Sequence, residues 1–141
     1  MVTKGKATII PTMRFHDAPR AIHWLCGAFG FEKHLVVPGE VEGTIAHAQL
    51  TLGDSMIMLG SHRDDEFGKL QVPMPRPTAP TTQSAYVLVD DCDRHHARAV
   101  SAGADVVKPP EDQDYGGRLY ICRDLEGHVW SFGTYDPWAL D

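Results

Sequence analysis

The sequence predicts an α+β fold made of two βαβββ modules in tandem, which form a concave mixed sheet with the helices on its outer face. The segment Tyr115–Tyr135 has the pattern of two short apolar strands joined by a polar turn at Asp124–Gly127, and a weaker copy spans Thr44–Gly60. The turn glycines Gly53 and Gly127 lie 74 residues apart. This spacing indicates an internal repeat, and two such repeats side by side can share a core.

Composition indicates one globular domain of 141 residues, with 43% hydrophobic and 23% charged residues. The net charge of −6 argues against nucleic acid or an anionic membrane as the main partner, because both attract basic patches. No run is apolar enough to span a bilayer or to act as a signal peptide, so we expect a cytoplasmic protein. Cys26, Cys92 and Cys122 have no paired spacing and are expected to be free thiols.

The first module covers about residues 7–60. Its opening strand, residues 7–15, contains Pro11, which favours an edge position or a bulge because proline donates no ladder hydrogen bond. Asp17 has the chemistry of an N-cap, and Gly30 that of a helix stop, so a helix is expected between them. Three strands are predicted to follow, over residues 31–37, 43–52 and 55–59.

Residues 61–82 interrupt this pattern with a charged stretch and then four prolines between Pro73 and Pro80. Such a segment is predicted to be an extended connector without a packed core, either a lid or a linker. The second module, about residues 83–136, begins with a strand over 84–89 and a helix capped by residues 90–93. A strand over Val106–Lys108 and an acidic loop after Pro109 are expected before the final two strands.

Alternation along each strand assigns the two faces of the sheet. Met56 and Met58 are predicted to face the first helix, and Trp130 and Phe132 the second. The opposite faces are predicted to form one concave, mostly apolar wall, which is typical of a small-ligand pocket. The alternatives are a second buried core or a dimer contact. The wall consists of Ile10, Thr12, Ile45, His47, Gln49, Ile57, Leu59, Ser84, Tyr86, Leu88, Leu119, Ile121, Arg123, Val129 and Ser131.

His47 is the one candidate for catalysis, since it should point into the concavity near Gln49 and imidazole titrates near neutral pH. A buried, hydrogen-bonded histidine is the alternative. Aromatic rings can stack on a planar ligand, with ordinary packing as the alternative. Arg118 and Arg123 can meet a ligand anion, with surface ion pairs to nearby aspartates as the alternative. The predicted ligand-binding set is His47, Gln49, Ile57, Ser84, Tyr86, Tyr115, Ile121, Arg123 and Ser131.

The other histidines are assigned structural or solvent positions. His128 follows a turn glycine and is expected to hold the turn. His95 and His96 lie on the polar side of the second predicted helix and are expected to be solvated.

The tandem modules, the segment Val89–Asp93 and the turn Arg123–His128 resemble the vicinal oxygen chelate superfamily of glyoxalase I, extradiol dioxygenases, fosfomycin-resistance enzymes and bleomycin-resistance proteins. The ending Gly127–Tyr135 resembles an uncharacterised glyoxalase-like branch of it. The resemblance implies a homodimer, because pockets in this superfamily are often completed between paired modules. It is specific for the fold and weak for activity, since one fold hosts many functions.

In the metal-dependent members, the first and last strands of each module supply His, Glu or Gln ligands. The matching positions here are Ile10, Ile57, Ser84 and Ser131, and none of them suits a divalent ion. The resemblance therefore predicts no metal and no cofactor.

The resulting hypothesis is a metal-independent protein that binds a small molecule in an apolar concave pocket; it favours binding without catalysis and leaves catalysis open. The alternatives are a glyoxalase-like lyase or isomerase, a dioxygenase-like metalloenzyme, or a module whose sheet face serves assembly.

Overall fold

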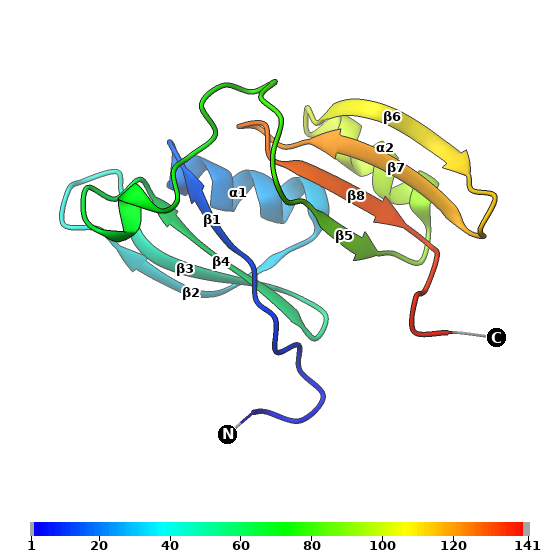
Figure 1. The fold of residues 1–141 in the computed structure, drawn as a ribbon, viewed down its shortest axis with the longest axis horizontal. Coiled ribbons are helices and arrows are strands. Elements are labelled where there is room, and N and C mark those ends of the chain that lie inside the picture. The colour runs from blue at the N-terminus through cyan, green and yellow to red at the C-terminus, as the bar shows by residue number, and fades with distance from the viewer. Residues whose placement is uncertain (1, 140–141) are drawn as a thin grey trace. The chain divides into compact units, whose positions relative to one another are not determined.

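The computed structural model describes residues 2–139, which divide after Pro75 into two compact units, here unit 1 and unit 2. Each unit holds one helix and one four-stranded mixed sheet in βαβββ order, as the sequence predicts (Figure 1). Among the described residues, no helix is long and apolar enough to cross a membrane.

Unit 1 has the strand order β1-β4-β3-β2, in which β1 runs parallel to β4 and the other neighbours are antiparallel. In chain order its elements are β1 (Thr12–Phe15), α1 (Ala18–Phe29), β2 (Glu32–Pro38), β3 (Ile45–Leu52), β4 (Ser55–Ser61) and the 3₁₀-helix η1 (Phe67–Lys69).

Unit 2 repeats this arrangement with the order β5-β8-β7-β6, and β5 runs parallel to β8. Its elements are β5 (Ala85–Leu88), α2 (Cys92–Ser101), β6 (Asp105–Asp112), β7 (Arg118–Arg123) and β8 (Val129–Gly133).

Both helices begin at the predicted caps. The carboxylate of Asp17 accepts a hydrogen bond from the backbone N–H of Arg20 at 3.2 Å, and that of Asp91 accepts one from Arg94 at 3.0 Å. Gly30 ends α1 in a left-handed conformation with φ of 90°. Each helix therefore has a defined start, and its apolar side covers one face of the sheet in its own unit (Figure 1).

The face assignment predicted for unit 2 is confirmed. Trp130 and Phe132 of β8 are fully buried, together with Tyr120 and Cys122 of β7. The register pairs Tyr120 with Phe132 and Cys122 with Trp130, so these four side chains share the face that α2 covers. The opposite face, here the open face of unit 2, carries the residues that alternate with them.

The face assignment predicted for β4 is wrong. The register pairs Leu50 with Ile57 and Ala48 with Leu59, and all four side chains are buried on the side of α1. The open face of unit 1, which lies opposite α1, therefore receives Met56 and Met58 from β4, while His47 and Gln49 of β3 lie on it as predicted.

Two predicted strand bounds also change. The ladder of β1 begins only at Thr12, because Pro11 has no N–H to extend it. Strand β6 continues through Pro109 and Pro110 to Asp112, where a loop was predicted. Both prolines are tolerated because β6 is an edge strand with an irregular register between Lys108 and Glu111.

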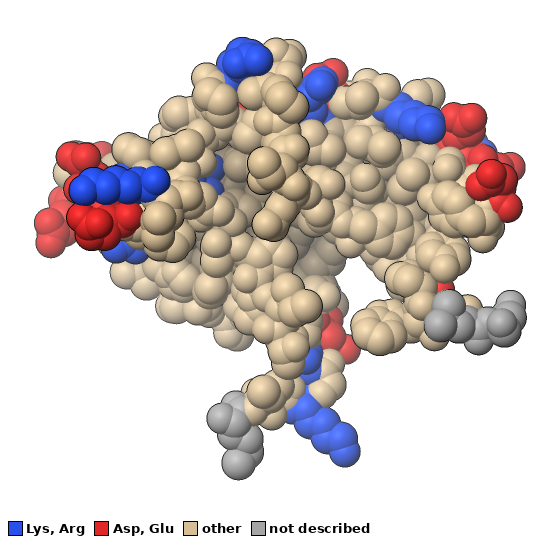
Figure 2. Space-filling model, viewed as in Figure 1, with Lys and Arg blue, Asp and Glu red and all other residues tan. Residues whose placement is uncertain are grey.

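The connector is more structured than predicted, since η1 lies within it and Met74 and Ala79 are buried. The side-chain amide of Gln71 donates to the carbonyl oxygen of Thr12 at 2.8 Å. The Phe67 ring lies 5.3 Å from the guanidinium of Arg14. The first part of the connector is therefore packed on unit 1. In Figure 2, charged side chains gather over the η1 end of this unit and on its N-terminal segment.

Candidate functional site

On the open face of unit 2, side chains from neighbouring strands form a continuous row. Ser131 pairs with Tyr86 on one side and with Ile121 on the other, and Ile121 pairs in turn with Lys108. Residues paired across neighbouring strands point to the same face, so these side chains lie next to one another. Four members of the predicted ligand-binding set, namely Tyr86, Ile121, Ser131 and Arg123, are therefore brought together on this face.

Aromatic side chains lie at the β5 end of this row. The hydroxyl of Tyr86 donates to the carbonyl oxygen of Tyr135 at 2.6 Å, and the ring of Tyr135 meets the ring of Tyr115 edge to face at 5.2 Å. Gly133 permits this arrangement, because a Cβ there would lie 2.8 Å from the Tyr86 hydroxyl. Tyr86 is still 42% exposed, so its ring is held in place and remains accessible. Burial is the main cause that raises the pKa of the Tyr86 hydroxyl, which keeps it a neutral donor.

The two arginines of β7 are mainly engaged by carboxylates. Arg123 contacts Asp105 at 3.0 Å, whereas Arg118 contacts both Asp93 and Asp112 at 3.0 Å. Surface pairing, the alternative considered for these residues, is therefore present for both. Arg123 stays on the open face beside Val129, where a charged group borders the apolar row.

The open face of unit 1 holds His47 and Gln49, which lie together as predicted. The side-chain amide nitrogen of Gln49 lies 3.0 Å from Nε2 of His47, and both residues are half-buried. The register places Gln49 between Met58 and Leu35. This face thus combines an imidazole and an amide with apolar neighbours.

The position predicted for Ile57 is corrected by the register. Turn Gly53–Asp54 joins β3 to β4 directly after Leu52, whereas the segment 124–128 separates Arg123 from Val129 in unit 2. The two turns differ in length. Matching the two units at Gly53 and Gly127 therefore misplaces β4 by one residue relative to β8. The counterpart of Ser131 is Met58, and Ile57 is a buried core residue on the α1 side.

The donor set at the positions used by metal-dependent relatives does not fit a divalent ion. With the correction, these positions hold Ile10 and Met58 in unit 1 and Ser84 and Ser131 in unit 2. Aliphatic, thioether and hydroxyl groups are poor ligands for the hard or borderline ions that His and carboxylates hold. In residues 2–139, no group of three or more His, Cys, Asp or Glu side chains is placed to bind a metal.

Sequence reasoning missed several neighbours of the predicted set. Tyr135 supports Tyr86 and Tyr115, Met58 adjoins Gln49, and Asp105 neutralises Arg123. For Met58 a signal existed, because a two-residue turn fixes the pairing of the strands beside it.

Of the predictions for the remaining histidines, one is confirmed and one is wrong. His128 does hold the turn, since its backbone N–H donates to Oδ1 of Asp124 at 3.0 Å and its carbonyl accepts from the Asp124 N–H. The predicted solvation of His95 and His96 is wrong. Nδ1 of His95 lies 2.6 Å from the Tyr120 hydroxyl, and His96 meets the Tyr120 ring edge to face. The buried hydroxyl of Tyr120 needs a polar partner, which explains why α2 turns a histidine inward.

The cysteines are predicted to react slowly with thiol reagents in the native protein. Burial raises the pKa of the Cys122 thiol to about 12, and it also raises the pKa of Cys26 and Cys92. The reactive thiolate is therefore scarce at neutral pH. With Ellman's reagent we expect slow release that becomes complete and fast only in denaturant, with Cys122 the last to react. A native thiol that reacts as fast as free cysteine would contradict this and reopen the case for a nucleophile.

Comparison with known proteins places this geometry in a family. The model of the Glyoxalase/Bleomycin resistance protein/Dioxygenase superfamily matches residues 11–132. The uncharacterized protein Mb0911c of Mycobacterium bovis is 32% identical over 133 residues, which cover 94% of this chain and 86% of that protein.

Solved structures agree with this match. TioX from Micromonospora sp. ML1 is 32% identical with a TM-score of 0.69, covering 92% of this chain and 99% of that chain. The fosfomycin resistance protein FosX from Mesorhizobium loti shares the fold at 16% identity and a TM-score of 0.66, with 97% of both chains covered. The tandem βαβββ units and these matches together show that the chain belongs to the Glyoxalase/Bleomycin resistance protein/Dioxygenase superfamily.

Proposed function

We propose that the protein binds a small, partly aromatic molecule on the open face of its sheets without a divalent metal. The row Tyr86–Ser131–Ile121 supports this best, because it offers a fixed aromatic ring, a hydroxyl and an aliphatic side chain on neighbouring strands. Apolar surface with a few placed polar groups is the usual composition of a ligand site. A homodimer that completes this site stays a prediction.

Direct binding measurements test the proposal. Isothermal titration against a panel of planar aromatic compounds should give binding that a chelator leaves unchanged. Ser131→Trp should weaken the affinity by about tenfold or more, equivalent to ~1.4 kcal/mol, because the indole would cover the centre of the row.

Ser101→Trp is the matched control, since it makes the same substitution at an exposed position in α2. It should bind as the unmodified protein does. Equal affinity in Ser131→Trp and Ser101→Trp would rule out the open face of unit 2 as the binding surface.

A metal-dependent activity is the competing function, and the hydrogen-bonded pair His47 and Gln49 is the observation that favours it. Elemental analysis of protein purified without added metal separates the two. Stoichiometric nickel, zinc, manganese or iron, lost on replacement of His47 with alanine, would overturn metal-independent binding.

A further inference from the structure

The N-terminal arm, defined here as residues 2–10, is separated from the sheet by Pro11. The carbonyl oxygen of Pro11 accepts the last ladder hydrogen bond, from the N–H of Met58 at 2.9 Å. Since proline cannot donate in return, the chain leaves β4 at this point. Four residues before Pro11, the arm contacts the sheet again, because the N–H of Ala7 donates to the carbonyl oxygen of Asp54 at 3.0 Å.

A second contact holds the arm on the β3–β4 turn. Nζ of Lys6 lies 2.9 Å from Oδ1 of Asp54, and both side chains are more than half exposed. An exposed ion pair and one backbone hydrogen bond are weak anchors, so the arm can open and close without unfolding unit 1.

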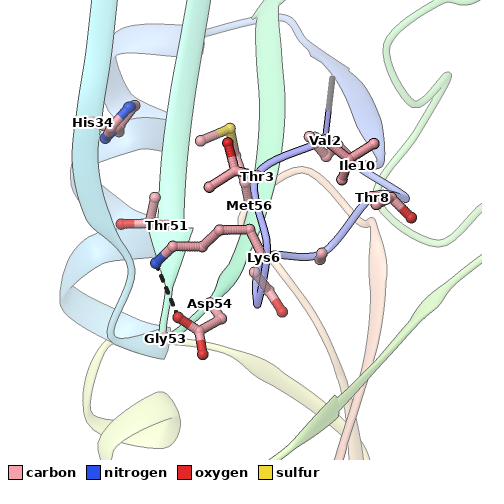
Figure 3. Close-up of a pocket in the computed structure, with 12 residues that line it drawn as sticks. Val2, Thr3, Lys6, Thr8, Ile10, His34, Thr51, Gly53, Asp54 and Met56 are labelled. Carbon is pink, nitrogen blue, oxygen red and sulfur yellow. Dashed lines mark hydrogen bonds and ion pairs between the residues drawn. The ribbon is translucent and has the colours of Figure 1, made fainter.

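A cavity of about 640 Å³ lies between this arm and the turn end of the sheet (Figure 3). Thr51 and Met56 reach it from the sheet, where they are paired neighbours on the open face of unit 1. The volume is within the range of small-molecule sites. No residue of the ligand-binding set predicted from the sequence lines it, and the row Tyr86–Ser131–Ile121 that supports the proposed function belongs to unit 2, so this site depends on contacts within unit 1 alone.

The lining combines hydroxyl groups with apolar side chains, and its one close ion pair is self-contained. The hydroxyls belong to Thr3, Thr8, Thr51 and Ser55, apolar surface comes from Val2, Ile10 and Met56, and His34 adds an imidazole. Lys6 and Asp54 neutralise each other, as the dashed contact in Figure 3 shows. A charged ligand would have to separate this pair or lie against a like charge.

We infer that this cavity is a second binding site, which takes an uncharged small molecule with a hydroxyl or amide group at one edge of an apolar body. Hydroxyl side chains both donate and accept, so they suit a neutral hydrogen-bonding edge. The arm closes over the ligand from the solvent side and is thereby held in place.

Three probes of the same shape and different charge test the ligand class: phenylethanol, phenylacetate and phenylethylamine. In proton–nitrogen correlation NMR of the whole chain, phenylethanol should shift the amides of Ala7, Thr51 and Met56. Both charged probes should bind several-fold more weakly. Phenylethanol should also slow trypsin cleavage after Lys4 and Lys6, because it holds the arm closed.

Three substitutions and one deletion test whether phenylethanol binds in this cavity. Thr51→Trp should abolish the phenylethanol shifts by filling the cavity, and deletion of residues 2–6 should do so by removing its cover. Lys6→Gln should weaken binding by at most about fivefold, since an exposed ion pair is a small contribution. Lys4→Gln is the matched control, because it removes the same charge from an arm residue that does not line the cavity, and it should bind normally.

Three results would overturn the inference: no shift at the highest soluble phenylethanol concentration, tighter binding of phenylacetate, or unchanged binding in the deletion variant. Ser131→Trp should leave the phenylethanol shifts intact, so failure here and failure of the proposed function remain distinguishable. If Thr51→Trp does not fold, as its NMR spectrum would show, the deletion variant decides, because it leaves all the strands of unit 1 in place.

Discussion

Replacing Asp124 with alanine is expected to lower the free energy of unfolding by about 3–5 kcal/mol, because three buried or half-buried donors lose their acceptor. Oδ1 of Asp124 accepts from the backbone N–H groups of Glu126 and His128, both at 3.0 Å, and Oδ2 accepts from the indole Nε1–H of Trp130 at 3.0 Å. Asp124 is 5% exposed, so its carboxylate and the donors that it accepts from are shielded from bulk water. Urea denaturation monitored by tryptophan fluorescence measures the loss.

Asp124→Asn is the informative conservative variant. Its single oxygen can keep the two backbone donors, but its amide nitrogen would then face the indole N–H, and two donors cannot pair. We expect a loss of about 1–3 kcal/mol, smaller than for alanine. A loss below about 0.5 kcal/mol for alanine, a size typical of ordinary surface substitutions, would contradict the structural role assigned to this carboxylate.

The difference in stability between the unmodified protein and Asp124→Asn should depend on pH, and its direction follows from the pKa of Asp124. Burial raises the pKa of Asp124 above its unfolded value, against the opposing effects of His128 and the donated hydrogen bonds. The folded state therefore holds the proton more tightly than the unfolded state, and stability falls as pH rises between the unfolded and the folded pKa. Asparagine does not titrate. The stability of the unmodified protein relative to Asp124→Asn should thus decrease as pH rises through that window.

The turn that contains Asp124 shows why the fold was predictable from the sequence. Its polar residues and glycine are a local signal, and alternation is clear in the strand that follows, where Trp130 and Phe132 flank Ser131. Local chemistry of this kind also identifies the helix caps at Asp17 and Asp91. Elements specified by nearby residues are therefore predicted correctly.

The wrong predictions concern a strand whose sequence pattern fits both orientations, or residues whose contact partner is distant in the sequence. Residues 56–59 are all apolar, so alternation could not orient β4, and only the short turn at Gly53–Asp54 contained the answer. His95 looked solvated because its partner, the hydroxyl of Tyr120, comes from a strand further along the chain. The arm could not be foreseen either, since its contact with Asp54 joins residues far apart in sequence.

Gly127 is the second position where a single change should have a large effect. It adopts φ of 100°, a conformation that residues with a Cβ rarely adopt. A Cβ at this position would lie 2.4 Å from the carbonyl oxygen of Pro77 and 2.7 Å from the carbonyl carbon. Because these are backbone atoms, the clash cannot be relieved by a side-chain rotation, and the connector itself would have to move.

Gly127→Ala is therefore expected to lower the free energy of unfolding by about 3 kcal/mol or more, from the backbone strain and the steric clash together. Gly103→Ala separates the two causes. Gly103 has φ of 93°, and a Cβ added there would meet no atom within 4 Å. Strain alone should therefore cost about 1–2 kcal/mol at that position.

Hydrogen exchange adds a local readout at Ala79, whose N–H donates to the carbonyl oxygen of Arg76 at 3.2 Å. That amide should exchange faster in Gly127→Ala than in Gly103→Ala, because only the first substitution displaces the Pro77 backbone beside it. Equal losses of stability in the two variants would mean that the contact between this turn and the connector contributes nothing to the fold.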